Sequence, residues 1–422
     1  MRHKTYLPLT GLLVLALLFL AACGGAAPAV EAPAEEVAPT EAVAPAAEEP
    51  APAVEVETAA PSGEPIRFGV VQPLTGPVAE GGAHVVSGIE IAVDRINADG
   101  GVMGRPLEAV VADGKCDPQE SSNAAQLLIT RDKVPVLLGA YCSSATLAVM
   151  PLLEQEGVPM VVETSSSWKI TDPGTPGYAW VYRTAPTSGM EAAAAEPLLA
   201  GLGVSKVAVM SVNNDWGRGA AEEFGSVIQN IGGEVVSTDF IDTLAVDFSP
   251  QLTAIKNSDA DTLLITTDVP QVAGILKQFR ELGLTQTVLS SGGVLYPELL
   301  IELTNQETAE GVYSVVFWLP GMPETAGDPE LSAWYVEEYN RRGLPATGLG
   351  ESWKGFDATY VIANAIEASG GNLDSASLND ALKKVEFDGL GGHIAFTEAE
   401  GHQTKLNVYI GQIRGGILTT PE

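Results

Sequence analysis

The sequence contains few residues of the kinds that bind metals or nucleic acids. Its 422 residues include only three cysteines and four histidines, which are scattered without zinc-ligand spacing, so we expect no metal site. Lysine and arginine number 22 against 54 acidic residues, and the net charge of −32 disfavours a nucleic-acid partner, because phosphate binding needs clustered basic residues. The G-x-S-x-G, Walker A and H-E-x-x-H signatures are also absent. We therefore predict no enzymatic activity and no cofactor.

The first 23 residues have the organisation of an export leader. A basic start precedes the apolar run 12–22, which is short for a membrane span. The run ends in Leu-Ala-Ala-Cys-Gly at 20–24, which resembles a bacterial lipobox, the motif whose cysteine is lipidated. We predict a lipoprotein signal peptide over 1–23 and a lipid on Cys23 that anchors the protein to the cell membrane, facing the extracytoplasmic side. The alternative is an ordinary signal peptide with an incidental cysteine.

Residues 24–64 differ in composition from the rest of the chain. Alanine, proline, glutamate and valine dominate this segment, which has no lysine, arginine or aromatic residue. Such a segment buries too little apolar surface to offset the entropy of ordering it, and proline and like charge keep it extended. We predict a disordered spacer between the membrane and the folded body.

From residue 65 onward, apolar runs typical of strands alternate with patterns of helical period. The predicted strands are 66–71, 107–112, 134–138, 158–162, 180–183, 205–211, 234–239, 261–266, 287–290 and 311–317. This alternation predicts an α/β fold with parallel sheets, and the number of strands favours two doubly wound lobes over one. Ligands bind such lobes beyond the carboxyl ends of the strands, so facing loops would enclose a cleft. The C-terminal part is expected to add helices at 331–342, 356–368 and 378–384 and strands at 394–397 and 405–413.

The segment 136–146 is the strongest candidate for a binding loop. An apolar strand breaks at Gly139 and leads through Ser143 and Ser144 into a helical pattern. The free N–H groups and positive dipole end of such a helix attract an anion, and the hydroxyls add donors, so a carboxylate is the natural ligand. The alternative is that one serine only caps the helix.

Several ordered motifs resemble the type I periplasmic binding proteins, most closely the leucine/isoleucine/valine-binding group. They are the segment 96–107, with the sequence INADGGVMGRPL, the loop 73–77, and Cys116 and Cys142 in the loops after the second and third strands. The resemblance implies a monomeric, cleft-closing solute receptor for an ABC permease. It also implies a Cys116–Cys142 disulfide, which is credible in an exported protein; two free thiols are the alternative.

The resemblance also implies a three-stranded hinge, with the chain crossing between lobes near residues 184, 318 and 407. The corresponding parts are a first part of lobe I at 65–184, lobe II at 185–317, a second part of lobe I at 318–406, and a C-terminal hinge and lobe II segment at 407–422.

The resemblance assigns roles to specific side chains. Ser143 matches the serine that binds the ligand carboxylate, and the turn Thr164-Ser165-Ser166 matches a segment that contacts the ammonium and carboxylate. Trp216 matches an aromatic residue that closes over the ligand. For each residue the alternative is an ordinary structural role, as a turn or as packing.

Two further candidates follow from position. Tyr141 is a weaker aromatic candidate. Asp268 precedes a helix in a pattern typical of a capping box, so it is either a plain N-cap or a carboxylate that faces the cleft.

The sequence departs from the amino-acid-binding pattern in two places. The acidic partner of the ammonium would fall within 290–293, which has no acid, and a first-lobe aromatic would fall near Gly81. Because a buried ammonium without an acid is costly, either Asp268 substitutes or the ligand is an amide, urea or another carboxylic acid. The predicted function is binding of a small amino acid or a related carboxylate or amide for an ABC importer, by hinge closure around the cleft. The alternatives are a ligand-sensing receptor of the same fold, or a protein that binds urea, an amide or an aromatic acid instead of an amino acid.

Overall fold

The computed structural model describes residues 60–293, 295–396 and 402–420. The predicted signal peptide 1–23, with Cys23, and most of the spacer 24–64 lie outside these residues, so the lipid anchor stays a prediction. None of the helices in the described ranges combines the length and apolar character needed to cross a membrane.

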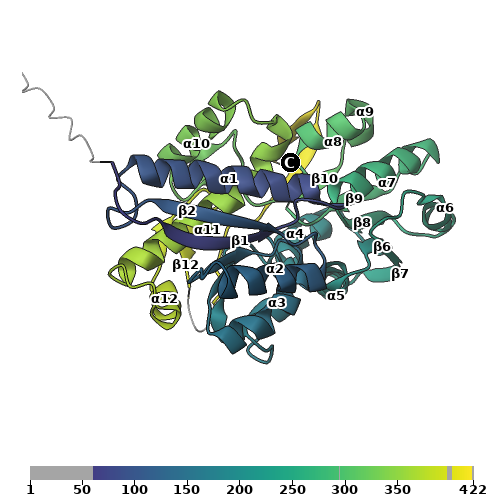
Figure 1. Cartoon of the computed structure of the whole chain (residues 1–422). Helices are drawn as coiled ribbons and strands as arrows, with labels where there is room; N and C mark the ends of the chain where they lie inside the picture. The colour runs from purple at the N-terminus through teal and green to yellow at the C-terminus, as the bar shows by residue number, and fades with distance from the viewer. Residues whose placement is uncertain (1–59, 294, 397–401, 421–422) are drawn as a thin grey trace, which may run out of the picture. The chain divides into compact units, whose positions relative to one another are not determined.

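The first sheet has five parallel strands in the order β2-β1-β3-β4-β5. Its strands are β1 (Ile66–Gln72), β2 (Leu107–Asp113), β3 (Leu137–Gly139), β4 (Met160–Val162) and β5 (Val181–Arg183). The helices α1 (Ala79–Ala98), α2 (Pro118–Thr130) and α3 (Ser143–Glu156) connect successive strands (Figure 1). Because β1 lies inside the sheet with helices on both faces, nearly all of its apolar residues are buried.

The second sheet has the order β14-β13-β10-β9-β8-β6-β7. The strands β6 (Lys206–Val212), β7 (Glu234–Ile241), β8 (Thr262–Thr266), β9 (Thr287–Ser290) and β10 (Tyr313–Val316) run parallel, whereas β13 (Tyr409–Arg414) and β14 (Ile417–Thr419) add antiparallel edge strands. Its helices are α4 (Ser188–Gly201), α5 (Asp215–Asn230), α6 (Ser249–Asn257), α7 (Val269–Glu281), α8 (Pro297–Leu303) and α9 (Gln306–Ala309).

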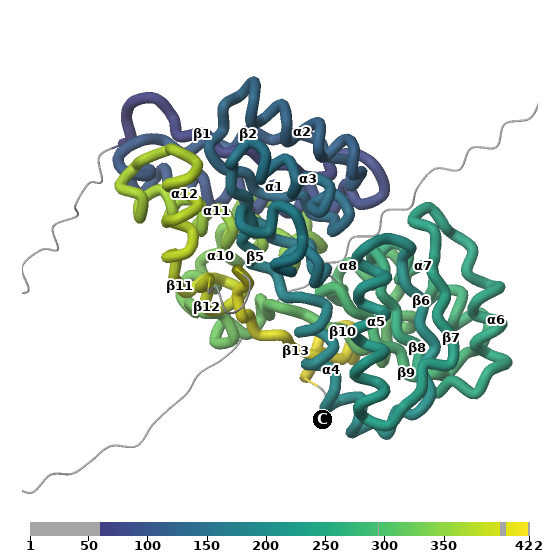
Figure 2. The backbone as a smooth tube through the Cα atoms, turned by 90° about the horizontal axis from the view of Figure 1, so that it is seen from below, coloured from purple at the N-terminus to yellow at the C-terminus, as the bar shows by residue number. Residues whose placement is uncertain are grey.

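The chain between the second sheet and its edge strands returns to the first sheet. This part contains α10 (Pro329–Arg341), α11 (Leu349–Ala368), α12 (Ser375–Leu382) and the two-stranded pair β11 (Glu386–Asp388) and β12 (His393–Ala395). Figure 2 shows these elements grouped with β1 and β2, whereas α5 to α8 surround the second sheet. Short 3-10 helices occupy Trp168–Thr171, Tyr178–Trp180, Pro323–Thr325 and Ala346–Gly348.

The long contact between α1 and α11 depends on small residues in both helices. A side chain at Gly88 of α1 would overlap the carbonyl of Ser352, and one at Gly355 of α11 would overlap the carbonyl of Val85. The two backbones can therefore approach closely, and α11 is buried on most of its circumference. This contact positions the start of α11 beside the loops of the first sheet.

The predicted α/β fold with two doubly wound lobes is confirmed, and the ten predicted strands between 66 and 317 are present. Several C-terminal expectations were wrong in their limits. The helix expected at 378–384 spans Ser375–Leu382, because the side chain of Asp374 caps it there, and the strand expected at 394–397 spans His393–Ala395. The strand expected at 405–413 begins only at Tyr409, where its pairing partner β10 ends at Val316. The helix expected from residue 356 begins at Leu349, because burial against α1 stabilises a first turn whose glycines and charges weaken the helical pattern.

Candidate functional site

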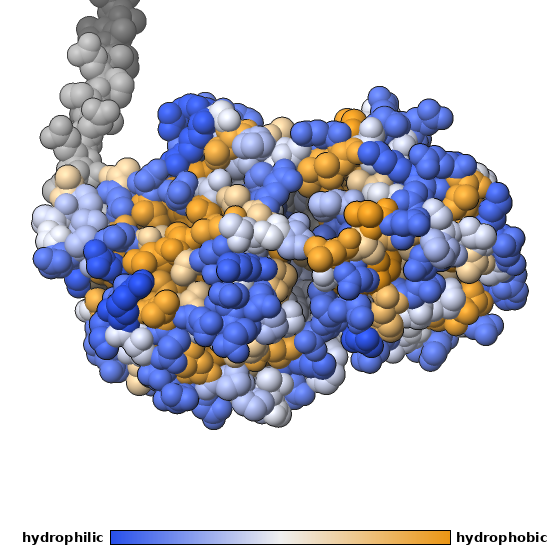
Figure 3. Space-filling view, turned by 45° about the vertical axis from the view of Figure 1, so that its right-hand side comes forward, coloured by the Kyte–Doolittle hydropathy of each residue, from blue (hydrophilic) through white to orange (hydrophobic). Residues whose placement is uncertain are grey.

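Loops from both sheets line one cavity of about 280 Å³. Most of these loops follow the carboxyl ends of strands, as in other doubly wound folds. The surface is hollowed where the two halves of the folded body meet (Figure 3). Seven of the eight predicted ligand residues line this cavity: Tyr141, Ser143, Thr164, Ser165, Ser166, Trp216 and Asp268. Ser144 is not part of the lining.

Ser143 is the first residue of α3, and the N-cap position belongs to Cys142. No side chain caps this helix, so the alternative role predicted for Ser143 and Ser144 is not what the structure shows. The first intrahelical bond comes from Thr146 N to Cys142 O, which leaves the preceding N–H groups at the helix start without helical acceptors. Ser143 is 3% exposed, and its Oγ accepts a hydrogen bond from Ser167 N at 3.2 Å. The cavity wall at this point is therefore a helix N-terminus suited to an anion.

The three hydroxyls of the turn after β4 are used differently. Ser165 Oγ donates to Tyr141 O at 2.8 Å and lies 2.8 Å from Thr146 Oγ1, and Ser166 Oγ lies 3.2 Å from Ser188 Oγ. Thr164 Oγ1, in contrast, has no described partner in good hydrogen-bonding geometry, although it interacts with the neighbouring Glu163 carboxylate. Thr164 is therefore the hydroxyl of this turn that is held least firmly by the protein.

Arg183, at the end of β5, fixes the position of this turn. Its Nη1 donates to the carbonyl oxygens of Ser165 at 3.2 Å and Ser167 at 2.6 Å, and its Nε donates to Gln403 Oε1 at 2.5 Å. The guanidinium is fully buried, and this burial lowers the pKa of Arg183 to about 9. The turn that carries Thr164 is thereby tied to the segment after β12.

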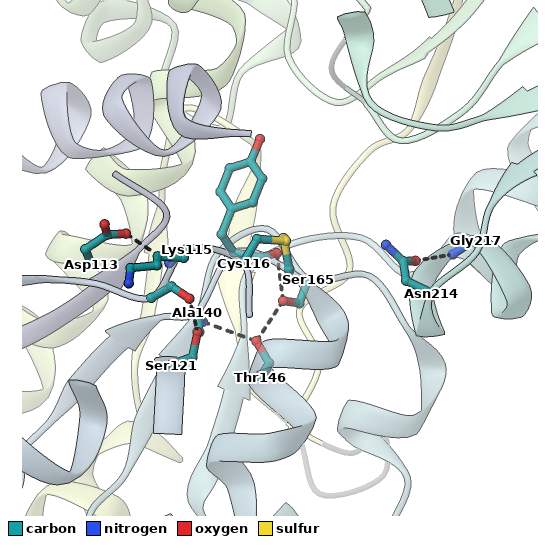
Figure 4. Close-up of a disulfide and its surroundings, with 12 residues drawn as sticks. Asp113, Lys115, Cys116, Ser121, Ala140, Thr146, Ser165, Asn214 and Gly217 are labelled. Carbon is teal, nitrogen blue, oxygen red and sulfur yellow. Dashed lines mark hydrogen bonds between the residues drawn. A yellow bond between two sulfur atoms is a disulfide. The ribbon is translucent and has the colours of Figure 1, made fainter. Parts of the chain in front are cut away.

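A disulfide joins Cys116 and Cys142, with their Cα atoms 5.4 Å apart, as the family resemblance implied. It links the loops that follow β2 and β3, and both cysteines line the cavity. Figure 4 shows the disulfide next to the Thr146–Ser165 hydrogen bond. The bond therefore holds the start of α3 against the neighbouring loop of the same sheet.

The two aromatic side chains of the cavity each occupy space that a glycine leaves open. Trp216, in the first turn of α5, is half-buried, and a Cβ on Gly292 would lie 2.7 Å from Trp216 Cζ2. Tyr141 lies over Gly81, where a Cβ would come within 2.9 Å of Tyr141 Cζ. The aromatic side chain that the sequence lacks at residue 81 is thus supplied by Tyr141 from another loop.

Asp268 occupies the N-cap position of α7, yet its carboxylate does not cap the helix. It lines the cavity and forms no ion pair with any described residue. Burial, together with the negative charge of Glu351, raises the pKa of Asp268 to about 6. The side chain is therefore a carboxylate without a partner at the ligand cavity.

Glu351, which was not among the predicted site residues, is a second carboxylate of the cavity and is more deeply buried than Asp268. It lies in the first turn of α11 and is 6% exposed, and its Oε2 accepts a hydrogen bond from Lys354 Nζ at 2.9 Å. The signal available in the sequence was the occurrence of three charged residues, Glu351, Lys354 and Asp357, in the first half of a mostly apolar helix.

The segment 290–293 contains no acidic residue, but the buried Glu191 contacts it from another helix. Glu191 Oε2, from α4, accepts a hydrogen bond from Gly292 N at 2.6 Å. Glu163, at the end of β4, accepts a hydrogen bond from Gln72 Nε2 at 2.6 Å. Burial raises the pKa of both Glu163 and Glu191 to about 7. These acids are outside the cavity lining, and their titration bears on stability rather than on direct ligand contact.

The chain is similar to solute-binding proteins over most of its length. A family model described as periplasmic binding protein matches residues 65–416. The chain is 27% identical over 334 residues to the leucine-, isoleucine-, valine-, threonine- and alanine-binding protein of Pseudomonas aeruginosa. The aligned region covers 79% of this chain and 86% of that protein.

Solved structures show the same similarity. The leucine binding protein LivK of Thermotoga maritima has a TM-score of 0.75 at 27% identity, covering 85% of this chain and 98% of that one. A solute binding protein of an ABC transporter from R. palustris, in complex with 4-hydroxybenzoate, has a TM-score of 0.75 at 25% identity. The match covers 85% of this chain and 96% of that one.

Proposed function

Because the chain belongs to the periplasmic binding protein family, we propose that it binds a small α-amino acid in its cavity and delivers it to an ABC importer. Lipidation at Cys23 would tether the protein to the membrane, with 24–64 as the spacer. The observation that carries the proposal is one cavity that contains both a helix N-terminus with Ser143 and the unpartnered carboxylate of Asp268.

The helix start suits the carboxylate of the ligand. The N–H groups at the start of α3 and the hydroxyls of Ser143 and Thr164 supply several donors, and the helix dipole favours a negative charge there. A hydrogen bond to a charged group contributes about 1.5–3 kcal/mol, so two or three such bonds account for much of a micromolar affinity.

Asp268 suits the ammonium. A half-buried carboxylate that stays unpaired at the cavity wall loses part of its hydration without compensation, and an ammonium supplies the missing charge. This favours an amino acid over 4-hydroxybenzoate or urea, which would bring no positive charge to Asp268. Trp216 and the apolar side chains Leu299 and Leu303 form walls that can exclude water from the polar contacts.

Closure of the two lobes would complete the site, because Ser143 and Asp268 come from loops of different sheets. A ligand that bridges them stabilises the arrangement in which both contacts form. The arrangement with both contacts formed would then be the one presented to the permease.

Isothermal titration calorimetry of the mature chain with amino acids, urea, simple amides and 4-hydroxybenzoate tests the proposal. We expect saturable binding of at least one α-amino acid, weakened in both Ser143→Ala and Asp268→Asn. Asp239→Asn is the matched control, since it removes the same charge from β7, outside the cavity lining. Tight binding of 4-hydroxybenzoate or urea without any amino-acid binding would overturn the proposal.

A further inference from the structure

One oxygen of the Glu351 carboxylate has no hydrogen-bond partner among the described residues, and the proposed function assigns it no contact with the ligand ammonium. Glu351 lines the cavity and is 6% exposed, and its Oε2 is bonded to Lys354 Nζ at 2.9 Å. Its Oε1 is buried and forms no hydrogen bond with any residue in the described ranges. A buried acceptor without a partner calls for an explanation, and at the wall of a ligand cavity a donor carried by the ligand supplies one.

The surroundings of Glu351 define which kind of partner fits. Lys354, itself 1% exposed, already balances the charge of Glu351. Glu163 and Glu191 also interact electrostatically with the ammonium group of Lys354, but both acids lie outside the cavity lining. The Tyr141 phenol interacts with the Glu351 carboxylate by charge and by a side-chain hydrogen bond, but Oε1 itself has no described donor in hydrogen-bonding geometry.

We propose that Glu351 Oε1 is a second polar subsite, which binds a neutral hydrogen-bond donor in the ligand side chain, a hydroxyl or an amide N–H. This inference rests on the proposed amino-acid function and narrows its ligand class to polar, uncharged amino acids. The ammonium is assigned to Asp268, because that carboxylate has no cation of its own, whereas Glu351 has Lys354.

The subsite makes Glu351 a specificity-determining residue. An aliphatic side chain would cover Oε1 without supplying a donor, and a buried acceptor left in that state weakens binding. A cavity whose buried acceptor binds a ligand donor discriminates strongly against a ligand of the same shape that lacks the donor. An apolar cavity discriminates much less against a ligand that carries an extra hydroxyl. We therefore expect discrimination between ligands of equal shape.

Calorimetry with isosteric pairs measures this discrimination directly. Threonine should bind about tenfold or more tightly than valine, and asparagine should exceed leucine by a similar factor. The double variant Glu351→Met/Lys354→Met removes Glu351 together with its ion-pair partner, and it should lose the preference for threonine and asparagine. The control is Asp380→Met/Lys383→Met, which removes an ion pair of the same spacing at the C-terminal end of α12, outside the cavity lining.

The outcomes separate this inference from the proposed function. If valine and leucine bind as tightly as threonine and asparagine, the inference is wrong and amino-acid binding stands. If lysine or arginine binds most tightly, the assignment of a neutral donor is wrong. If no amino acid binds, both proposals fall, and if the double variant does not fold, the isosteric pairs on the wild-type chain decide alone.

Discussion

The affinity for the ligand should depend on pH through Asp268. Burial and the nearby Glu351 raise the pKa of Asp268 from an ordinary 3.8 to about 6 in the ligand-free protein. A ligand ammonium pairs only with the ionised carboxylate, so ligand binding lowers the pKa of Asp268. At any pH where Asp268 is protonated in the free protein, binding therefore releases its proton. Affinity is therefore full above about pH 7 and is lost as the pH falls through about 6.

The magnitude follows from the ionised fraction. At pH 5, one unit below a pKa of about 6, only about a tenth of the molecules carry the ionised carboxylate, which weakens binding about tenfold relative to pH 7.5. Asp268→Asn should weaken binding at pH 7.5 by about 2 kcal/mol, roughly 30-fold, and should remove most of the pH dependence.

Titration calorimetry between pH 5 and 8, in buffers of different ionisation enthalpy, measures the affinity and the proton release together. We expect close to one proton released per ligand at pH 5 and almost none at pH 8. Equal wild-type affinities at pH 5 and 7.5 would refute the assignment of Asp268, as would an unchanged pH profile in Asp268→Asn. Asp239→Asn should behave like the wild type.

Three further predictions concern stability and packing. The ligand-free protein should melt at a higher temperature at about pH 5.5 than at about pH 8. The pKa of Glu163 is raised to about 7 in the folded protein, so its protonated carboxyl stabilises the fold at low pH, and this stabilisation is lost as the pH rises through 7. Glu163→Gln should reduce the difference between the two melting temperatures in a calorimetric scan. Replacing both Cys116 and Cys142 by serine should lower the free energy of unfolding by about 3 kcal/mol in urea titrations, because the closed loop spans 26 residues, and an unchanged midpoint would contradict this. Gly292→Ala should destabilise the protein by about 1–3 kcal/mol and change the fluorescence of Trp216, because residue 292 has φ +104° and its Cβ would lie 2.7 Å from that ring; a variant with wild-type stability would refute the packing argument.

The sequence was most informative where the structural cause is local. Strand–helix alternation predicted the α/β fold, since each element is specified by the period of its own apolar residues. Asp117 caps α2 through the amides of Gln119 and Glu120, a role that its place directly before a proline favours. The loop carrying Ser143 was found in the same way, because it directly follows a strand of the parallel sheet, whereas the role of the turn at Thr164 came from the family resemblance.

Contacts between distant segments were beyond the sequence. Tyr141 takes the place of an aromatic at Gly81, and Glu191 reaches Gly292 across about one hundred residues of chain. Glu351 joins the cavity only because glycines let α11 pack closely on α1. By itself the sequence determined the elements and the loops that meet at the ends of strands, since these depend on local periodicity; only the tertiary structure decided which charges share a cavity, since that depends on packing between remote helices.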